Sequence, residues 1–323
     1  MDFENFCSYL EVVDKESNQA LKDGCEWYFT FGKDKLRKLK KSIKHKYSIW
    51  VKDFSKNSKD NEPKWNVLLP DIENISKKNR KERFEILTSL YFTNCDSFIS
   101  MGNNSQILVA PKGKEMEAIR SLQIEEKFVG TKAYNTRKFI NWDVIKNNCQ
   151  TCSDIIFVDL YAFSQEEIEF EKNAYQIILD ICTPLNNSYV NIVFFTRREN
   201  NYNGIRYTTP VSSIIRNLKQ RILDFNGCQA NITFVLIKNE EHDRTIFTNF
   251  NFFDSGDTYM YFRQKEESSV SKGRLFHVNS YLDKDIYLLT KESLNDLQKL
   301  VDEKNRLLGG IMGDKICNFL DFG

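Results

Sequence analysis

The sequence predicts an α/β fold whose C-terminal half contains a mostly parallel sheet. Three short apolar segments from residue 154 onward have the length and β-branched content of buried strands. Two segments of helical length separate them, and two parallel strands can be joined only by a crossover of this kind. We therefore expect three parallel strands connected by two helices.

These elements can be assigned in order along the chain. An acidic first half predicts a helix over residues 166–182, because negative side chains stabilise a helix N-terminus. A proline in the first turn and apolar residues on one side predict a second helix over residues 210–225. The strands that these helices separate are expected at residues 155–161, 190–196 and 232–237.

The preceding part of the chain predicts a separate domain of mixed character. Residues 27–31 form an aromatic run typical of a strand, residues 82–91 favour a helix, and residues 106–110 favour another strand. This order predicts an α/β or α+β domain. We place the boundary so that the two domains span residues 1–150 and 151–323.

The N-terminal domain contains the most basic segment of the chain, residues 33–46. Three apolar residues share one helical face there, and lysine and arginine fill most of the rest. Such a face either binds nucleic-acid phosphates by releasing counterions or is simply solvated. We favour nucleic acid over a membrane surface because the apolar stripe is narrow. The candidate contacts are Lys35, Arg37, Lys38, Lys41 and Lys44.

Composition gives no global sign of a partner. Lysine plus arginine number 46 and aspartate plus glutamate 45, so the net charge is +1 and no long-range field singles out a polyanion. The eight cysteines are scattered in a chain of 323 residues, which predicts reduced thiols. No apolar run reaches the length of a membrane span, and the N-terminus lacks a signal-peptide pattern. We expect a cytoplasmic protein.

One segment carries a motif with chemical meaning. His242 and Arg244 are two residues apart, Asn249 follows after four more residues, and Gly256-Asp257 after a further six. Alternate residues of a strand share a face, so His242 and Arg244 can address one phosphate. Arg197 and Arg198 follow the second predicted strand, at the edge where open α/β sheets bind ligands, and are candidates for the same anion site.

This spacing resembles the signature of the phospholipase-D-like superfamily, which is His-x-Lys, four residues, Asp, six residues, Gly-Ser. Arg244 stands at the lysine, Asn249 at the aspartate and Asp257 at the serine. The His-Asp-Arg triplet and the upstream Asp159-Leu160-Tyr161 are similar to the C-terminal domain of MIT-domain proteins and to domains of prokaryotic defence and mobile-element proteins. The resemblance covers the C-terminal half and implies a phospholipase-D-like fold there.

The departures from the signature bear on activity. Enzymes of the superfamily use two histidines from two motif copies, lysines that hold the phosphate, and an aspartate that orients the imidazole. This chain has one copy, and asparagine lacks the carboxylate, whereas arginine keeps the cation and adds a bidentate fork. The resemblance therefore implies recognition of DNA or RNA phosphate, or of a protein partner, without cleavage, in an antiviral defence or mobile-element system.

Two alternatives remain open. A homodimer that joins two His242 side chains would form a metal-independent nuclease, with His242 as nucleophile, Arg244 on the phosphate and Asn249 beside the imidazole. The resemblance to the C-terminal domain of MIT-domain proteins also implies a third function, that of a membrane-associated scaffold. Cys149 and Cys152 have the spacing of half a zinc site without further ligands nearby, and no glycine-rich phosphate loop occurs, so we expect neither a metal nor another cofactor.

Overall fold

The computed structural model forms two compact units, which are described separately. The first comprises residues 1–123 and 280–289, and the second residues 124–279 and 290–323. The structure describes residues 75–88, 90–93, 100, 106–111, 121–122, 141–163, 170–185, 188–197, 209–238, 244–256, 258–259, 261–262, 276–281 and 284–323.

The described part of the first unit mixes helix and strand, as predicted. After the 3-10 turn η1 (Ile75–Lys77), helix α5 (Arg80–Leu87) begins with a capping box, in which the side chains of Asn79 and Glu82 each accept from the other residue's backbone N–H. Strand β1 (Leu90–Thr93) pairs parallel with β2 (Leu108–Pro111). The α5 ring of Phe84 lies 5.5 Å, between centroids, from that of Tyr287.

The second unit is built on a seven-stranded sheet in the order β8-β7-β6-β3-β4-β5-β9. Its parallel centre, β3 paired with β4 and β4 with β5, confirms the three predicted strands and their direction. The strands are β3 (Asp154–Val158), β4 (Tyr189–Thr196), β5 (Gln229–Ile237), β6 (Arg244–Phe247), β7 (Asn251–Ser255), β8 (Phe276–Ser280) and β9 (Leu307–Gly313).

The prediction of a mostly parallel sheet is wrong. Strand β6 pairs antiparallel with β3 and with β7, and β9 pairs antiparallel with β5. The reason lies in the connections. A helix leads from β3 to β4 and another from β4 to β5, whereas a short turn joins β6 to β7, and a short turn can join only antiparallel strands.

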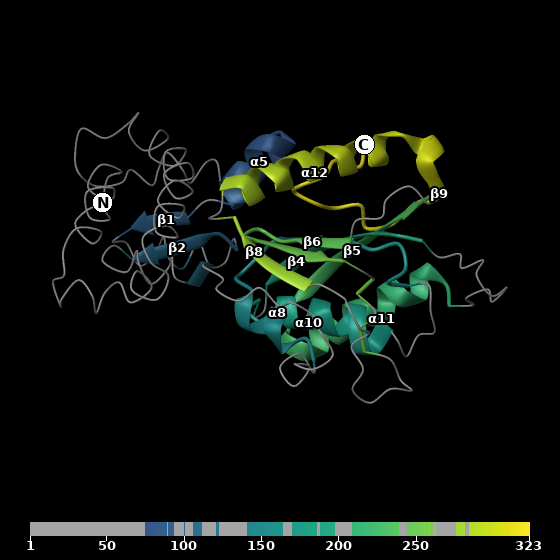
Figure 1. The fold of residues 1–323 in the computed structure, drawn as a ribbon, viewed down its shortest axis with the longest axis horizontal. Helices are drawn as coiled ribbons and strands as arrows, with labels where there is room; N and C mark the ends of the chain where they lie inside the picture. Colours follow the sequence, from purple (N-terminus) through teal and green to yellow (C-terminus); the bar gives the residue numbers. More distant parts are fainter. Residues whose placement is uncertain are drawn as a thin grey trace. The chain divides into compact units, whose positions relative to one another are not determined.

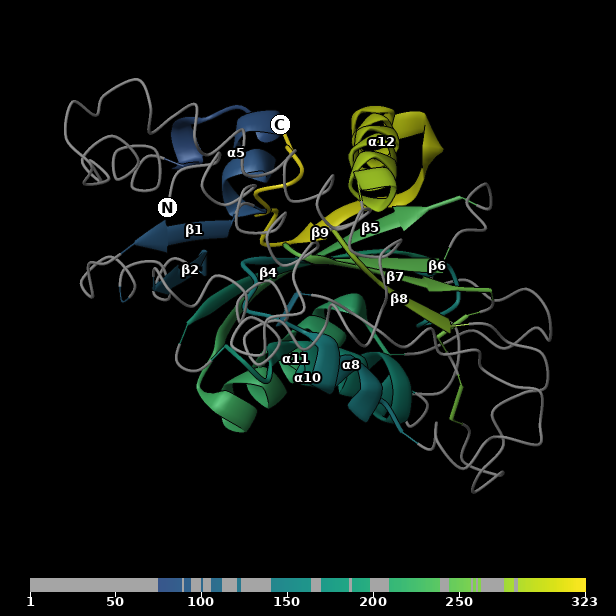
Figure 2. The same ribbon diagram turned by 60° about the vertical axis from the view of Figure 1, so that its left-hand side comes forward.

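Helices cover both faces of this sheet (Figure 1). One face carries α8 (Asp143–Asn148), α10 (Gln176–Cys182), which continues a π-helical turn η3 (Glu171–Tyr175), and α11 (Val211–Asn226). The opposite face carries residues 290–302 of α12 (Lys284–Asp302), and the 3-10 turn η4 (Lys304–Arg306) then leads into β9 (Figure 2). Helix α11 follows Pro210 and ends at Asn226, and the next residue, Gly227, has the φ of 72° that favours glycine after a helix C-terminus.

The main core lies between the sheet and the α8–α10–α11 layer. Phe163, which is fully buried, places its ring against Phe170, Phe194 and Phe234 with centroid distances of 5.1, 4.9 and 5.1 Å. Fully buried isoleucines of α10 and α11 complete this cluster. Such aromatic contacts add to the area buried and fix the strand ends against the helices.

Within the described parts of the chain, no helix is both long enough and apolar enough to cross a membrane.

Candidate functional site

The sheet register brings four polar residues to one edge, here named the carboxyl edge: Asp159, Arg197, Lys238 and Arg244. The first three directly follow the parallel strands β3, β4 and β5, whose ends share an edge. Arg244 begins β6, which runs antiparallel to β3 with Thr245 opposite Val158, so Arg244 comes opposite Asp159. The carboxyl edge is therefore a product of the mixed topology.

Asp159 is fully buried and organises this edge. Its carboxylate accepts hydrogen bonds from the Tyr161 N–H at 2.9 Å, the Thr258 hydroxyl at 2.6 Å and the Tyr259 N–H at 2.7 Å. Burial raises the pKa of Asp159, while these hydrogen bonds and the positive charge of Arg244 act in the opposite direction. The carboxylate thus joins residues 258–259 to the end of β3.

Arg244 is held at this edge by its backbone and by an aromatic ring. The Tyr259 hydroxyl lies 3.2 Å from the carbonyl oxygens of both Arg244 and Phe253 and can donate to either. The guanidinium carbon of Arg244 lies 6.0 Å from the ring centroid of Tyr161, at the limit of a cation–π contact. Arg244 and Tyr161 are both partly exposed, so this pair is accessible to a ligand.

Arg197 and Lys238 supply further cations at the same edge. The Arg197 N–H donates to the Leu160 carbonyl at 3.0 Å, which extends the pairing of β3 and β4 beyond the strands. Alternation along the strands places Arg197 on the face opposite to Arg244. The Lys238 ammonium donates to the Asn305 carbonyl at 2.7 Å. Sequence reasoning missed Lys238, although it follows β5 as Arg197 follows β4.

The structure does not bring Asn249 to Arg244. Asn249 is fully buried, and its Oδ1 accepts from the N–H groups of Ser153 at 3.0 Å and Asp154 at 3.2 Å, where β3 begins. Arg244 begins β6 at the carboxyl edge, whereas Asn249 lies in the turn that follows the other end of this strand. Because residue 242 lies outside the described residues, a role for Asn249 beside its imidazole stays a prediction. The observed bonds are structural.

Asn249 belongs instead to the opposite edge, here named the amino edge, where the parallel strands begin. Asp154 is fully buried there, and its carboxylate accepts from Ser153 Oγ at 2.6 Å and Asn191 Nδ2 at 3.1 Å. It also accepts from the Asn318 N–H at 2.7 Å and Asn318 Nδ2 at 2.8 Å. The last residues of the chain therefore bond to the first residue of β3.

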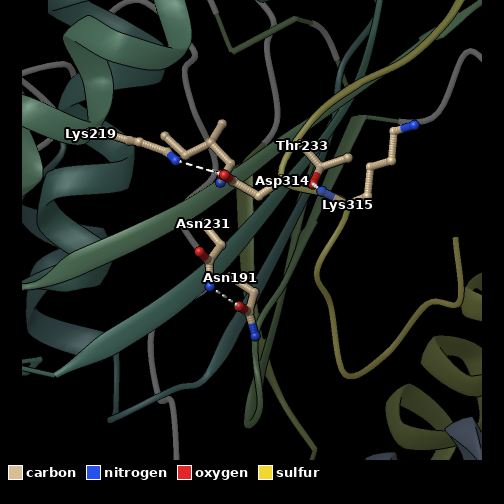
Figure 3. A network of polar contacts seen from close by, with 7 residues as sticks. Asn191, Lys219, Asn231, Thr233, Asp314 and Lys315 are labelled. Carbon is tan, nitrogen blue, oxygen red and sulfur yellow. Dashed lines mark hydrogen bonds and ion pairs between the residues drawn. The ribbon is translucent and has the colours of Figure 1, made fainter. Parts of the chain in front are cut away.

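Further contacts tie the C-terminal segment to the amino edge (Figure 3). The Lys219 ammonium of α11 lies 2.7 Å from an Asp314 carboxylate oxygen, and the Lys315 N–H donates to Thr233 Oγ1 at 2.9 Å. Asn231 Nδ2 donates to Asn191 Oδ1 at 3.0 Å, across β5 and β4. The polar groups named in this paragraph satisfy one another, which is the pattern of a structural network.

Several predicted site residues lie outside the described parts of the chain, and their roles stay predictions. They are His242, Arg198, Lys35, Arg37, Lys38, Lys41 and Lys44.

The cysteine pair gives no sign of a metal site. Cys149 and Cys152 are buried, and burial raises the pKa of both thiols, which disfavours the thiolate that a metal requires. Among the side chains that the structure describes, no group of three or more histidine, cysteine, aspartate or glutamate residues is placed to hold a metal ion.

A separate groove of about 490 Å³ runs along α11 and the first residues of β5. It is lined by Ser212, Ile215, Arg216, Lys219, Gln220, Leu223, Gln229 and Ala230, so it contains none of the predicted site residues.

Comparison with known proteins assigns no family. A scan against protein-family models found no match to this chain, and a search of curated proteins found none either. The likeness to the phospholipase-D-like superfamily therefore rests on Asp159-Leu160-Tyr161 and on the motif within residues 242–257.

Proposed function

We propose that the carboxyl edge binds the phosphate groups of DNA or RNA and that the protein does not cleave the bound strand. The observation that carries this proposal is the gathering of three cations at this edge: Arg244 begins β6, Arg197 follows β4 on the opposite face of the sheet, and Lys238 follows β5, in the strand order β6-β3-β4-β5. Open α/β sheets bind their ligands beyond the carboxyl ends of their strands. Three strand spacings cover about 14 Å, enough for several phosphates of a polynucleotide.

Arg244 is the central contact of this proposal. Its guanidinium is a planar fork suited to two phosphate oxygens, and it lies between the charge of Asp159 and the ring of Tyr161. Asp159 is buried and already accepts three hydrogen bonds, so its main contribution is to position the edge. A partly exposed cation on a rigid base loses little entropy on binding an anion.

Two observations support binding without cleavage. The sequence has a single copy of the motif, so a second motif histidine would have to come from another subunit. The Asn249 amide oxygen accepts from the N–H groups of Ser153 and Asp154 at the start of β3, at the edge opposite to Arg244, so the observed contacts of this side chain are structural. Membership of a prokaryotic antiviral defence or mobile-element system is proposed from the resemblance alone.

The test is a binding titration of labelled DNA and RNA, single-stranded and duplex, at two salt concentrations with divalent ions chelated. Arg244→Ala should weaken binding about tenfold and reduce the slope of log affinity against log salt by about one. Arg244→Lys should recover the slope but only part of the affinity, because it keeps the charge and loses the fork.

Lys299→Ala is the matched control. It also removes one positive charge, from an exposed site on α12 whose lysine pairs only with Asp296 among the described ion pairs, so binding should be unchanged. Equal affinity of Arg244→Ala and the wild type would refute the proposal. Metal-independent cleavage that disappears in His242→Ala would replace it with the nuclease.

A further inference from the structure

We propose that the carboxyl edge takes single-stranded nucleic acid and that Tyr161 provides the platform on which one base stacks. This inference rests on the proposed function, because it adds a base contact beside the phosphate contact of Arg244. It also selects one class of polynucleotide.

Tyr161 differs from its neighbours in exposure. Asp159, Leu160, Ala162 and Phe163 are at most 2% exposed, whereas the ring between them is partly exposed. A tyrosine that served only the core would be buried with them. Its position at the end of β3 places this ring at the carboxyl edge, beside Arg244.

The backbone that carries Tyr161 is fixed on two sides. Its own N–H donates to Asp159 Oδ1 at 2.9 Å. The preceding carbonyl, of Leu160, accepts from the Arg197 N–H at 3.0 Å and from Thr196 Oγ1 at 3.3 Å. A ring on so constrained a backbone is a preorganised surface, which reduces the entropy lost when a base stacks on it.

The other two described tyrosines near this edge, Tyr259 and Tyr261, are buried in the core. Tyr259 and Tyr261 are at most 1% exposed, and their hydroxyls bond to backbone carbonyls and to Ser255 Oγ respectively. They belong to the aromatic core around Trp142, whose ring centroid lies 5.4 Å from that of Tyr261. Among the described aromatic residues of this edge, Tyr161 therefore fits a ligand contact best.

An aromatic ring beside a cation is the usual means of binding single strands without reading sequence. The ring stacks on a base, and the cation contacts the neighbouring phosphate. The bases of a duplex are already stacked on one another, and removing one from the stack is costly. The pair Tyr161 and Arg244 should therefore favour single strands over duplexes and unmodified strands over strands without bases.

The experiment compares three labelled probes of equal length: oligothymidylate, an abasic strand with the same phosphates, and a duplex. The wild type should bind oligothymidylate at least about fivefold more tightly than the abasic strand. Tyr161→Leu should lower the affinity for oligothymidylate to that for the abasic strand, whereas Tyr161→Phe should retain the preference. Arg244→Ala should weaken both single strands by a similar factor and keep their ratio.

Each outcome separates the two proposals. If Tyr161→Leu keeps the wild-type preference, or if the wild type binds the abasic strand or the duplex as tightly as oligothymidylate, the stacking inference is wrong, while weaker binding by Arg244→Ala still supports the phosphate site. If no probe binds the wild type, both proposals fail.

Tyr161→Trp provides a second readout that does not depend on the leucine variant. Its added fluorescence should be quenched by oligothymidylate and not by the abasic strand, and equal quenching by both would contradict stacking.

Discussion

The amino edge and the carboxyl edge of β3, β4 and β5 both carry polar side chains, but the two edges differ in the partners of those side chains. At the amino edge, Asp154 accepts four hydrogen bonds, and Asn191, Asn249 and Asn318 bond to it or to its neighbours. At the carboxyl edge, a buried carboxylate, Asp159, stands among cations that follow or begin neighbouring strands. The described side chains of the amino edge bond mainly to one another and to nearby backbone, whereas the carboxyl edge gathers one carboxylate and three cations from neighbouring strands.

The contrast between the two edges also explains why the net charge of the chain does not indicate a partner. A chain with 46 basic and 45 acidic side chains can still separate them locally. At the carboxyl edge the three cations Arg197, Lys238 and Arg244 outnumber the one buried acid Asp159, whereas Asp314 at the amino edge is paired with Lys219. A local excess of positive charge, unlike the net charge, can direct a polyanion to one edge of the sheet.

The largest effect is expected at the amino edge, from Asp154→Ala. It removes the acceptor of four hydrogen bonds and leaves the partly buried donors of Asn191 and Asn318 without this acceptor, so the free energy of unfolding should fall by about 3 kcal/mol. Urea unfolding measures this, with the exposed Asp296→Ala as control. Nucleic-acid binding by the folded fraction should not change. A loss of less than about 0.5 kcal/mol would contradict a structural role.

A smaller loss is expected at the carboxyl edge, from Asp159→Asn. An amide offers one acceptor where the carboxylate serves three donors, and either orientation sets its NH₂ group against a backbone N–H. The free energy of unfolding should fall by about 2 kcal/mol. Thr258→Val removes one donor only and should cost about 1 kcal/mol. If Asp159→Asn costs more than Asp154→Ala, the contrast between the two edges fails.

Asn249→Asp tests which edge Asn249 serves, since it restores the aspartate of the superfamily signature. The new carboxylate would be buried beside Asp154, across Ser153, so its pKa should be raised and it should destabilise the fold by about 1 to 2 kcal/mol at pH 7. The deficit should shrink at pH 4, where the group is protonated. Urea unfolding at both pH values measures it. Gain of nuclease activity at undiminished stability would instead place Asn249 in a catalytic role.

The smallest effect is expected in the helical layer, away from both edges. Burial raises the pKa of Asp180 on α10 from 3.8 to about 6, so the folded state holds this proton more tightly than the unfolded state. Its contribution to stability is therefore lost as pH rises from about 4 to about 6. Relative to Asp180→Asn, the wild type should lose on the order of 1 kcal/mol between pH 4 and pH 7 in urea unfolding. If the difference in free energy of unfolding between the wild type and Asp180→Asn does not change with pH, Asp180 does not titrate in this range.

The sequence predicted those elements whose signals are local. The apolar strands β3, β4 and β5 and the amphipathic α11 follow from residue pattern and capping. Strand β9 was missed because three of its seven residues are glycine, which disfavours strands in general. Gly313 is required there by close approach: its φ is +100°, and a Cβ would lie 2.1 Å from the Ile232 carbonyl oxygen.

Local sequence signals also predicted part of the candidate site. Arg197 and Arg244 follow from the rule that ligands bind at strand ends, and Lys238 satisfies the same rule. The position of Asn249 depends on pairing between β6 and β3, which linear motif spacing does not contain. Arg244 begins β6 and Asn249 lies in the turn after Phe247, so the length of this strand places the two residues at opposite edges of the sheet.

The bond between Asp154 and Asn318 has a consequence for biosynthesis. These partners are 164 residues apart in sequence, and β9 pairs with β5 over a separation of 70 to 80 residues, from Ile237↔Leu307 to Thr233↔Gly313. During translation the amino edge must remain incomplete until Asn318 has been synthesised. Contacts between such distant segments close large loops and slow folding. Until then the nascent sheet exposes Asp154 and the open side of β5, so this unit should depend on chaperones more than a unit built from local contacts.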